Sequence, residues 1–133
     1  MGLDNGFILK STTDTDFPEI VKKRLDIHSL GDPNCEVIYW RKCYSMREDV
    51  LDIVHEPGKP DEFDVRVYPK QIPDIIEALS RYLDPDYWQE NADCIWDYDD
   101  MSLTLYYDVL ILNWLYFYLN KHPDKELIFY DSY

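Results

Sequence analysis

The chain has 133 residues, of which 46% are hydrophobic and 30% charged, and its formal net charge at neutral pH is −14. This length suits one domain that buries a core without a disulfide or metal, and the composition is that of a globular protein, which excludes a disordered chain or a membrane-spanning one. The acidic surplus argues against direct nucleic-acid binding and against an anionic membrane, because both need a surplus of cations.

Hydrophobic periodicity and turn residues divide the chain into strands and helices. In chain order we expect a strand at 6–10, a helix at about 17–28, a strand at 36–44, a helix from 45, a strand at 62–68, a helix at 74–83, a short helical piece around 87 and 88, a helix at about 100–121 and a strand at 126–131. The segment 94–98 fits either an extended link or a short strand.

Local signals set several of these boundaries. Asp16 to Glu19 and Ser45 to Glu48 have the spacing of capping boxes, and Asp84 is typical of a helix N-cap. Pro69 and Pro73 bracket an expected loop.

Two further patterns concern burial. Strict alternation from 62 to 68 predicts a strand with one solvated face, and turns are expected at 31–34 and 57–60. The long C-terminal helix is expected to bury one stripe, formed by Leu105, Val109, Leu112, Tyr116 and Leu119.

This order of elements predicts an α+β fold in a single domain spanning residues 1–133. We expect a small sheet of three or four strands, mixed or antiparallel, with helices packed on one face as a single pair of layers. A doubly wound sheet is disfavoured, because only the early connections are long enough for a βαβ crossover.

The number of cysteines and the two ends of the sequence indicate the cellular compartment that we expect. Cys35, Cys43 and Cys94 are odd in number and have no CxxC spacing. We expect no signal peptide and no lipidation motif, since the first residues lack an apolar h-region and the last lack a prenylation box. Reduced thiols in the cytoplasm are the resulting expectation.

Known catalytic and metal-binding signatures do not occur in this sequence. The potential metal ligands share no finger, ribbon or HExxH spacing: Cys35, Cys43, Cys94, His28, His55 and His122. Four glycines cannot supply a phosphate-binding loop or a dinucleotide fingerprint, and there is no nucleophile elbow. We therefore expect no metal and no cofactor, and an enzyme is disfavoured, although a carboxylate pair depends on a spatial separation that sequence does not supply.

The segment Tyr39–Arg47 is the most concentrated basic and aromatic part of this acidic chain. Arg41, Lys42 and Arg47 could bind an anion beside Trp40, together with Asp4 and Asn5 from the first turn. Alternatively, these cations balance internal carboxylates and stack on neighbouring rings. The second interpretation is favoured.

Acidic charge is concentrated in the second half. Residues 1–70 contain ten basic and fourteen acidic residues, whereas residues 71–133 contain three and thirteen. Between Arg81 and Lys121 there is no basic residue, but there are eight acidic ones: Asp84, Asp86, Glu90, Asp93, Asp97, Asp99, Asp100 and Asp108. With Tyr87, Trp88, Trp96 and Tyr98 they could form a face for a basic protein; otherwise they are solvated acids over buried rings.

Four sequence blocks carry a resemblance. The chain opens with Gly-Leu-Asp-Asn-Gly at 2–6, continues with Tyr-Trp-Arg-Lys-Cys at 39–43 and Ile-Trp-Asp-Tyr at 95–98, and closes with Phe-Tyr-Asp-Ser-Tyr at 129–133. In these blocks it resembles a family of short hypothetical proteins from bacteria and their phages, to which no reaction is attached. The resemblance implies a cytoplasmic bacterial or phage origin.

Three functional hypotheses follow. The first is a non-catalytic interaction module that binds a basic protein partner through an acidic, aromatic face including Tyr87, Trp88, Trp96 and Asp97. The second is an anion or small-molecule pocket, with catalysis open, formed by Asp4, Asn5, Arg41, Lys42 and Arg47 beside Trp40 and Trp96. The third is a structural subunit that associates with itself as a homo-oligomer.

Overall fold

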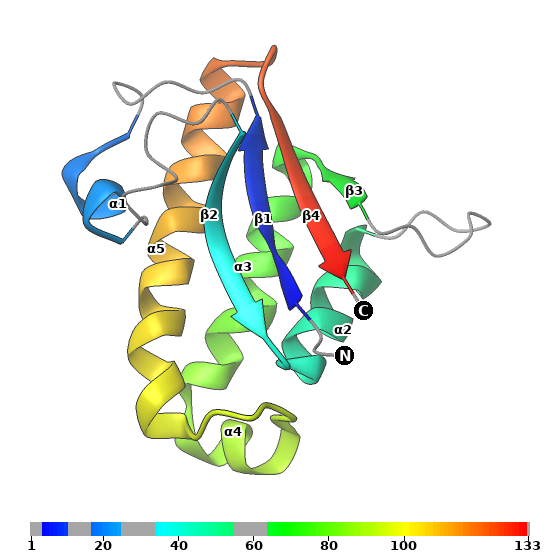
Figure 1. Cartoon of the computed structure of the whole chain (residues 1–133), viewed down its shortest axis with the longest axis vertical. Coiled ribbons are helices and arrows are strands. Elements are labelled where there is room, and N and C mark those ends of the chain that lie inside the picture. Colours follow the sequence, from blue (N-terminus) through cyan, green and yellow to red (C-terminus); the bar gives the residue numbers. More distant parts are fainter. Residues whose placement is uncertain (1–3, 11–16, 25–33, 55–63, 133) are drawn as a thin grey trace.

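The computed structural model describes residues 4–10, 17–24, 34–54 and 64–132 (Figure 1). Its strands and α-helices follow in this order: β1 (Asp4–Lys10), α1 (Glu19–Arg24), β2 (Asn34–Arg41), α2 (Tyr44–Val54), β3 (Asp64–Val67), α3 (Ile72–Ser80), α4 (Pro85–Asn91), α5 (Tyr98–Lys121) and β4 (Glu126–Ser132). The 3-10 helices Pro69–Gln71 and Arg81–Leu83 flank α3.

The four described strands form one antiparallel sheet in the order β2-β1-β4-β3. Figure 1 shows α2, α3 and α5 behind this sheet, so the fold has one sheet layer and one helical layer. The predicted α+β class with helices on one face is thereby confirmed, and of the two sheet types expected, the antiparallel one is found.

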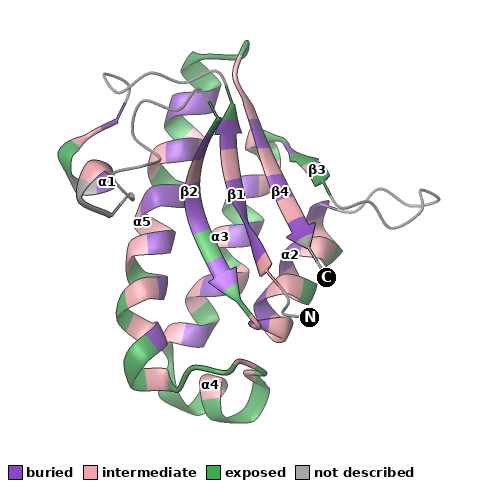
Figure 2. Ribbon diagram, in the orientation of Figure 1, coloured by how far each residue is buried: buried purple, intermediate pink, exposed green. Residues whose placement is uncertain are grey.

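The centre of the core is built from inward-facing side chains of the three longer strands. Phe7 of β1 lies with its ring centroid 5.0 Å from that of Phe129 of β4 and 5.9 Å from that of Trp40 of β2. All three are buried, because alternate residues of a strand point to the same face of the sheet (Figure 2). The buried side chains Leu79, Leu105 and Leu112 of α3 and α5 add to the same core.

Several element boundaries differ from the sequence prediction. Asp4 and Asn5, which were expected in a turn, already belong to strand β1. The expected loop between Pro69 and Pro73 is wrong: Pro69 begins a 3-10 helix and Pro73 lies in the first turn of α3. A proline is tolerated there because the first turn of a helix has no partner for its backbone N–H. Strand β2 ends at Arg41 and not at 44, because Lys42 takes a positive φ of 52° and the chain turns into α2.

Other boundaries agree closely. Asp84 caps α4 by accepting a hydrogen bond from the backbone N–H of Asp86, and α5 ends at Lys121, before Pro123. In the stripe predicted for α5, Leu105, Leu112 and Leu119 are buried, whereas Val109 and Tyr116 are half-buried. The capping residue Asp16, the turns at 31–34 and 57–60, and His28 and His55 lie wholly or mainly outside the described residues.

Gly6 marks a close approach within the sheet. A Cβ atom at this position would overlap the carbonyl oxygen of Ile38 and lie 2.8 Å from Cε1 of Tyr130. The Tyr130 ring therefore lies over Gly6, and its hydroxyl donates a hydrogen bond of 3.0 Å to Oε2 of Glu36 on β2. This bond spans the three strands β4, β1 and β2, and the absence of a side chain at Gly6 makes room for it.

We expect the substitution Gly6→Ala to lower the free energy of unfolding by roughly 1–3 kcal/mol, because the added methyl group has to displace backbone. Urea denaturation measures the change. Lys10→Ala, at the exposed end of the same strand, is the control and should change the free energy by less than about 0.5 kcal/mol. Equal effects of the two substitutions would contradict the close approach at Gly6.

Candidate binding pocket and acidic surface

A pocket of about 490 Å³ lies between the end of β2 and the start of α5. Its volume is in the range of sites that hold a small molecule. The pocket is lined by parts of three segments, namely Tyr39, Trp40 and Arg41 of β2, Cys43 and Trp96 of the connecting segments, and Asp100, Met101 and Thr104 of α5.

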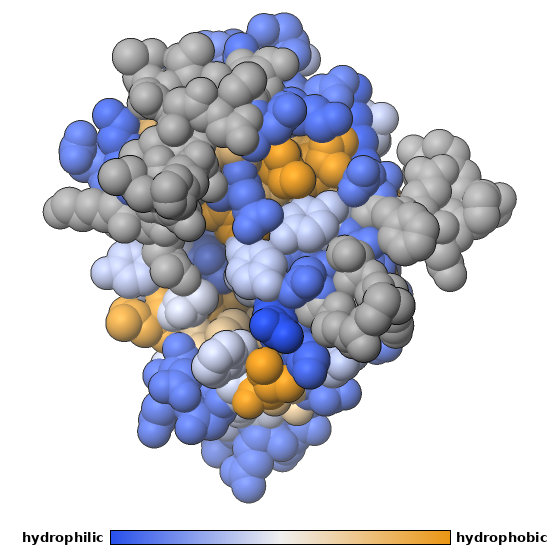
Figure 3. Space-filling view, in the orientation of Figure 1, coloured by the Kyte–Doolittle hydropathy of each residue, from blue (hydrophilic) through white to orange (hydrophobic). Residues whose placement is uncertain are grey.

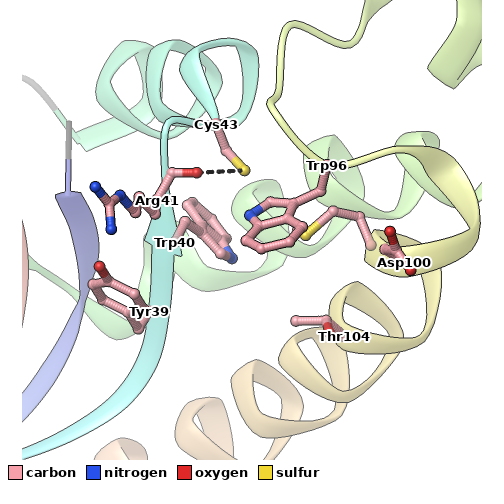
Figure 4. Close-up of a pocket in the computed structure, with 8 residues that line it drawn as sticks. Tyr39, Trp40, Arg41, Cys43, Trp96, Asp100 and Thr104 are labelled. Carbon is pink, nitrogen blue, oxygen red and sulfur yellow. Dashed lines mark hydrogen bonds between the residues drawn. The ribbon is translucent and has the colours of Figure 1, made fainter. Parts of the chain in front are cut away.

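Strand alternation determines how the β2 side chains meet the pocket. Trp40 is buried and points toward the helical layer, whereas Tyr39 and Arg41 are exposed on the other side of the strand. Figure 4 shows the indole rings of Trp40 and Trp96 turned toward each other, with Asp100 beyond Trp96. The guanidinium of Arg41 extends away from that side (Figure 4). The pocket thus has an aromatic and acidic side and a separate basic edge.

A buried hydrogen bond holds Trp40 in place. Its indole Nε1–H donates to Oδ2 of Asp108 on α5 over 2.9 Å, and both residues are only 2% exposed. Asp108 is therefore an exception to the acidic run that the sequence suggested as one outer face. Its position explains this, because Asp108 follows Leu105 by three residues and precedes Leu112 by four, on the apolar stripe of α5.

The segment before α5 is attached to the end of β2 by backbone and covalent links. Tyr44 N–H donates to the Asp93 carbonyl over 2.8 Å, and Ile95 N–H donates to the Lys42 carbonyl over 3.3 Å. Between these bonds Cys43 and Cys94 pair as an isolated antiparallel bridge and are joined by a disulfide. These links position Trp96, two residues further on, at the mouth of the pocket.

This disulfide corrects the expectation of three reduced thiols. Cys43 and Cys94 are 51 positions apart, so their spacing in the sequence contains no sign that the fold brings them together. Cys35 is buried in β2, outside the bridge.

Seven carboxylates form what we term the acidic surface, around α4 and the first turn of α5. All seven are exposed: Asp84, Asp86, Glu90, Asp93, Asp97, Asp99 and Asp100. In the described part of the chain, the ion pairs of lysine and arginine involve other acids, such as Glu77 with Arg81 and Glu126 with Arg66. Figure 3 shows hydrophilic residues over the α4 end of the molecule. The lysine and arginine side chains of the described residues therefore form no ion pair with the acidic surface.

Mutual repulsion within this surface is strongest at the start of α5. Asp97 caps the helix by accepting a hydrogen bond of 2.9 Å from the backbone N–H of Asp100. The negative charge of Asp97 raises the pKa of Asp100 above its ordinary value, and Asp99 adds to the effect. A cation placed beside Asp100 would relieve this repulsion.

The aromatic residues named from the sequence divide into two groups. The rings of Tyr87 and Trp88 on α4 are half-buried, with centroids 5.1 Å and 6.2 Å from that of Tyr82. They attach α4 to the body of the protein. Trp96 is 46% exposed and its neighbour Ile95 is 53% exposed, so these two supply the accessible apolar area beside the acidic surface.

Of the five residues expected to form an anion pocket, Arg41 lines this pocket and the other four do not. Arg47 donates from Nε and Nη2 to the two carboxylate oxygens of Asp131, over 2.9 Å and 2.6 Å. Asn5 is fully buried and donates to the same carboxylate over 2.6 Å. Arg47 and Asn5 thus hold the carboxylate of β4 inside the protein, which agrees with an internal role for this cation.

The three other members of that set lie near the C-terminal end of β2. Asp4 accepts a hydrogen bond of 2.6 Å from the Tyr39 hydroxyl, Lys42 occupies the turn after β2, and Arg41 lines the pocket. Sequence reasoning did not name Asp131, the partner of Arg47 and Asn5, as a site residue. The alternation Leu127, Phe129, Asp131 was the signal that could have placed it on the inner face of β4.

Among the described residues, no group of three or more His, Cys, Asp or Glu side chains is arranged to hold a metal ion. None of the helices that these residues form combines the length and the hydropathy that crossing a membrane requires.

We expect Arg47→Met to lower the free energy of unfolding by about 3 kcal/mol, because it leaves the buried Asp131 carboxylate without its cation. The double variant Arg47→Met, Asp131→Asn should recover part of this loss, since it removes the buried charge. Urea denaturation of the wild type and the variants gives the comparison. A loss below about 0.5 kcal/mol for Arg47→Met would show that Arg47 is available for another ligand.

Thiol labelling tests the disulfide. The protein is purified without reductant, unfolded in guanidinium chloride and treated with iodoacetamide. We expect one alkylated cysteine, Cys35, by mass spectrometry, and three after prior reduction. Three alkylated cysteines without reduction would contradict the Cys43–Cys94 bridge.

Comparison with protein-family models, with curated proteins and with solved structures finds no match to this chain. The resemblance to short bacterial and phage proteins accordingly stays a prediction. Any functional conclusion rests on the geometry of the pocket and the acidic surface.

Proposed function

We propose that this protein is a non-catalytic interaction module that binds a basic protein segment through the acidic surface and Trp96. The observation that carries the proposal is the set of seven exposed carboxylates around α4 and the start of α5, none of which pairs with a lysine or arginine of the described residues. Such a field attracts a cationic partner and accelerates its association.

Apolar area beside the carboxylates supports the same proposal. Ile95 and Trp96, in the segment that leads into α5, are about half exposed. Protein interfaces commonly surround a few aromatic or aliphatic anchors with a polar rim, and tryptophan is among the residues that most often dominate their binding energy. The acidic surface supplies the rim here, and Trp96 is the candidate anchor.

The alternative of an anion site receives less support from the same geometry. Arg47 and Asn5 are engaged with Asp131, and the pocket that Arg41 lines also contains the carboxylate of Asp100. A bound anion would add to the repulsion that Asp97 and Asp99 exert there. We therefore favour a cationic partner.

Surface plasmon resonance with a short peptide of alternating lysine and glycine tests this proposal. The triple variant Asp84→Asn, Asp86→Asn, Glu90→Gln removes three charges from α4. We expect the wild-type association rate to fall about tenfold or more between roughly 50 and 300 mM salt, because screening shortens the range of the attraction. The variant should associate more slowly and depend less on salt.

A control variant separates location from net charge. Glu48→Gln, Asp52→Asn and Asp64→Asn together remove three exposed acids of α2 and β3, outside the acidic surface. We expect this variant to bind the peptide almost as the wild type does. Equal losses in the two triple variants, or an association rate that is indifferent to salt, would contradict the proposal.

A further inference from the structure

The pocket adds selectivity that a field of exposed charges cannot provide. It adjoins the acidic surface and shares Asp100 with it, and the segment that carries Trp96 joins α4 to α5. Its aromatic side is formed by the indoles of Trp40 and Trp96, and Thr104 follows Asp100 by one helical turn (Figure 4). A carboxylate beside indole rings is suited to a side chain that is both flat and positively charged.

We infer that this pocket, if the proposed function holds, binds one arginine side chain of the basic partner, with its guanidinium on the face of Trp96 and bonded to the carboxylate of Asp100. Arginine is then the residue type that the interaction module recognises. The cavity, the exposed indole and the charge of the rim are the features that select it.

The chemistry of the rim selects a cation. The face of an indole ring is its negative side and attracts a cation within about 6 Å of the ring centroid. Asp100 lies at the same side of the pocket, next to Asp97 and Asp99. The raised pKa of Asp100 reflects repulsion by these neighbours, which a guanidinium would offset.

The shape of the aromatic side favours arginine over lysine. A guanidinium is planar, so it can stack on Trp96 while its N–H groups form paired hydrogen bonds with a carboxylate. An ammonium group is compact and more strongly hydrated, and it loses more on leaving water. Trp40 is held rigid by its bond to Asp108, so the ring facing Trp96 needs no ordering when a ligand enters.

Arg41 provides a test of whether the ligand of the pocket is a cation or an anion. It lines the pocket, but its guanidinium extends away from Trp96 and Asp100 (Figure 4). If a cation enters the pocket, removing the charge of Arg41 should leave affinity unchanged or raise it. If the pocket binds an anion, the same substitution should lower affinity.

Calorimetric titration with three peptides measures the preference. Each peptide has the same flanks of alternating lysine and glycine, with arginine, lysine or citrulline at the centre. Citrulline keeps the planar shape of arginine without its charge. We expect the arginine peptide to bind about tenfold more tightly than the citrulline peptide, with the lysine peptide between them.

Matched variants assign this preference to the pocket. Trp96→Leu and Asp100→Asn should each abolish most of the arginine advantage. Tyr106→Leu removes another exposed ring, from α5, and Asp52→Asn removes an exposed charge of α2; neither residue lines the pocket or belongs to the acidic surface, and both variants should keep the preference. Because Trp96 and Asp100 are exposed, we expect all four proteins to fold, which circular dichroism verifies.

Failure of this inference can be told from failure of the proposed function. If all three peptides bind equally and with strong salt dependence, or if Trp96→Leu keeps the full preference, the arginine inference is wrong. The proposal that the acidic surface binds a basic segment is then still supported. If none of the peptides binds in a salt-dependent manner, the proposed function itself is wrong. A loss of affinity on Arg41→Gln would overturn the inference in favour of an anion.

Discussion

The hydrogen bond between Trp40 and Asp108 is the interaction on which the rest of the structure depends. It joins the edge strand β2 to the long helix α5, between residues 68 positions apart, and it satisfies two polar groups that burial would otherwise penalise. On one side the Trp40 ring packs in the core with Phe7 and Phe129; on the other it forms a wall of the pocket. Core and candidate site therefore share one side chain.

A second constraint is the separation of charge between interior and surface. The cation Arg47 and the carboxylate Asp131 neutralise each other inside, whereas the seven carboxylates of the acidic surface are exposed. Internal pairing stabilises the end of the sheet, and exposure leaves the other charges able to attract a partner. The Cys43–Cys94 bridge connects these regions, because it holds the segment bearing Trp96 against the turn that leads from β2 to α2.

Sequence reasoning predicted the elements well where a local pattern decides the structure. The cap at Asp84, the alternation that ends in Val67 and the end of α5 at Lys121 all follow from neighbouring residues. The loop predicted between Pro69 and Pro73 was wrong, because prolines in the first turns of two helices give the same sequence pattern as prolines in a loop. For the candidate site, sequence reasoning placed Arg41 in a pocket beside Trp40 and Trp96, but it grouped them with Asn5 and Arg47, which bind Asp131 instead.

The sequence by itself determined the α+β class, most element boundaries and the excess of acid without local cations between positions 82 and 120, because periodicity, capping and charge counts act over a few residues. Only the tertiary structure decided that Asp108 is internal, that Cys94 meets Cys43 and that Asp131 takes Arg47. Each of these contacts joins residues at least 51 positions apart, and such distances depend on how helices and strands pack rather than on what each segment prefers alone.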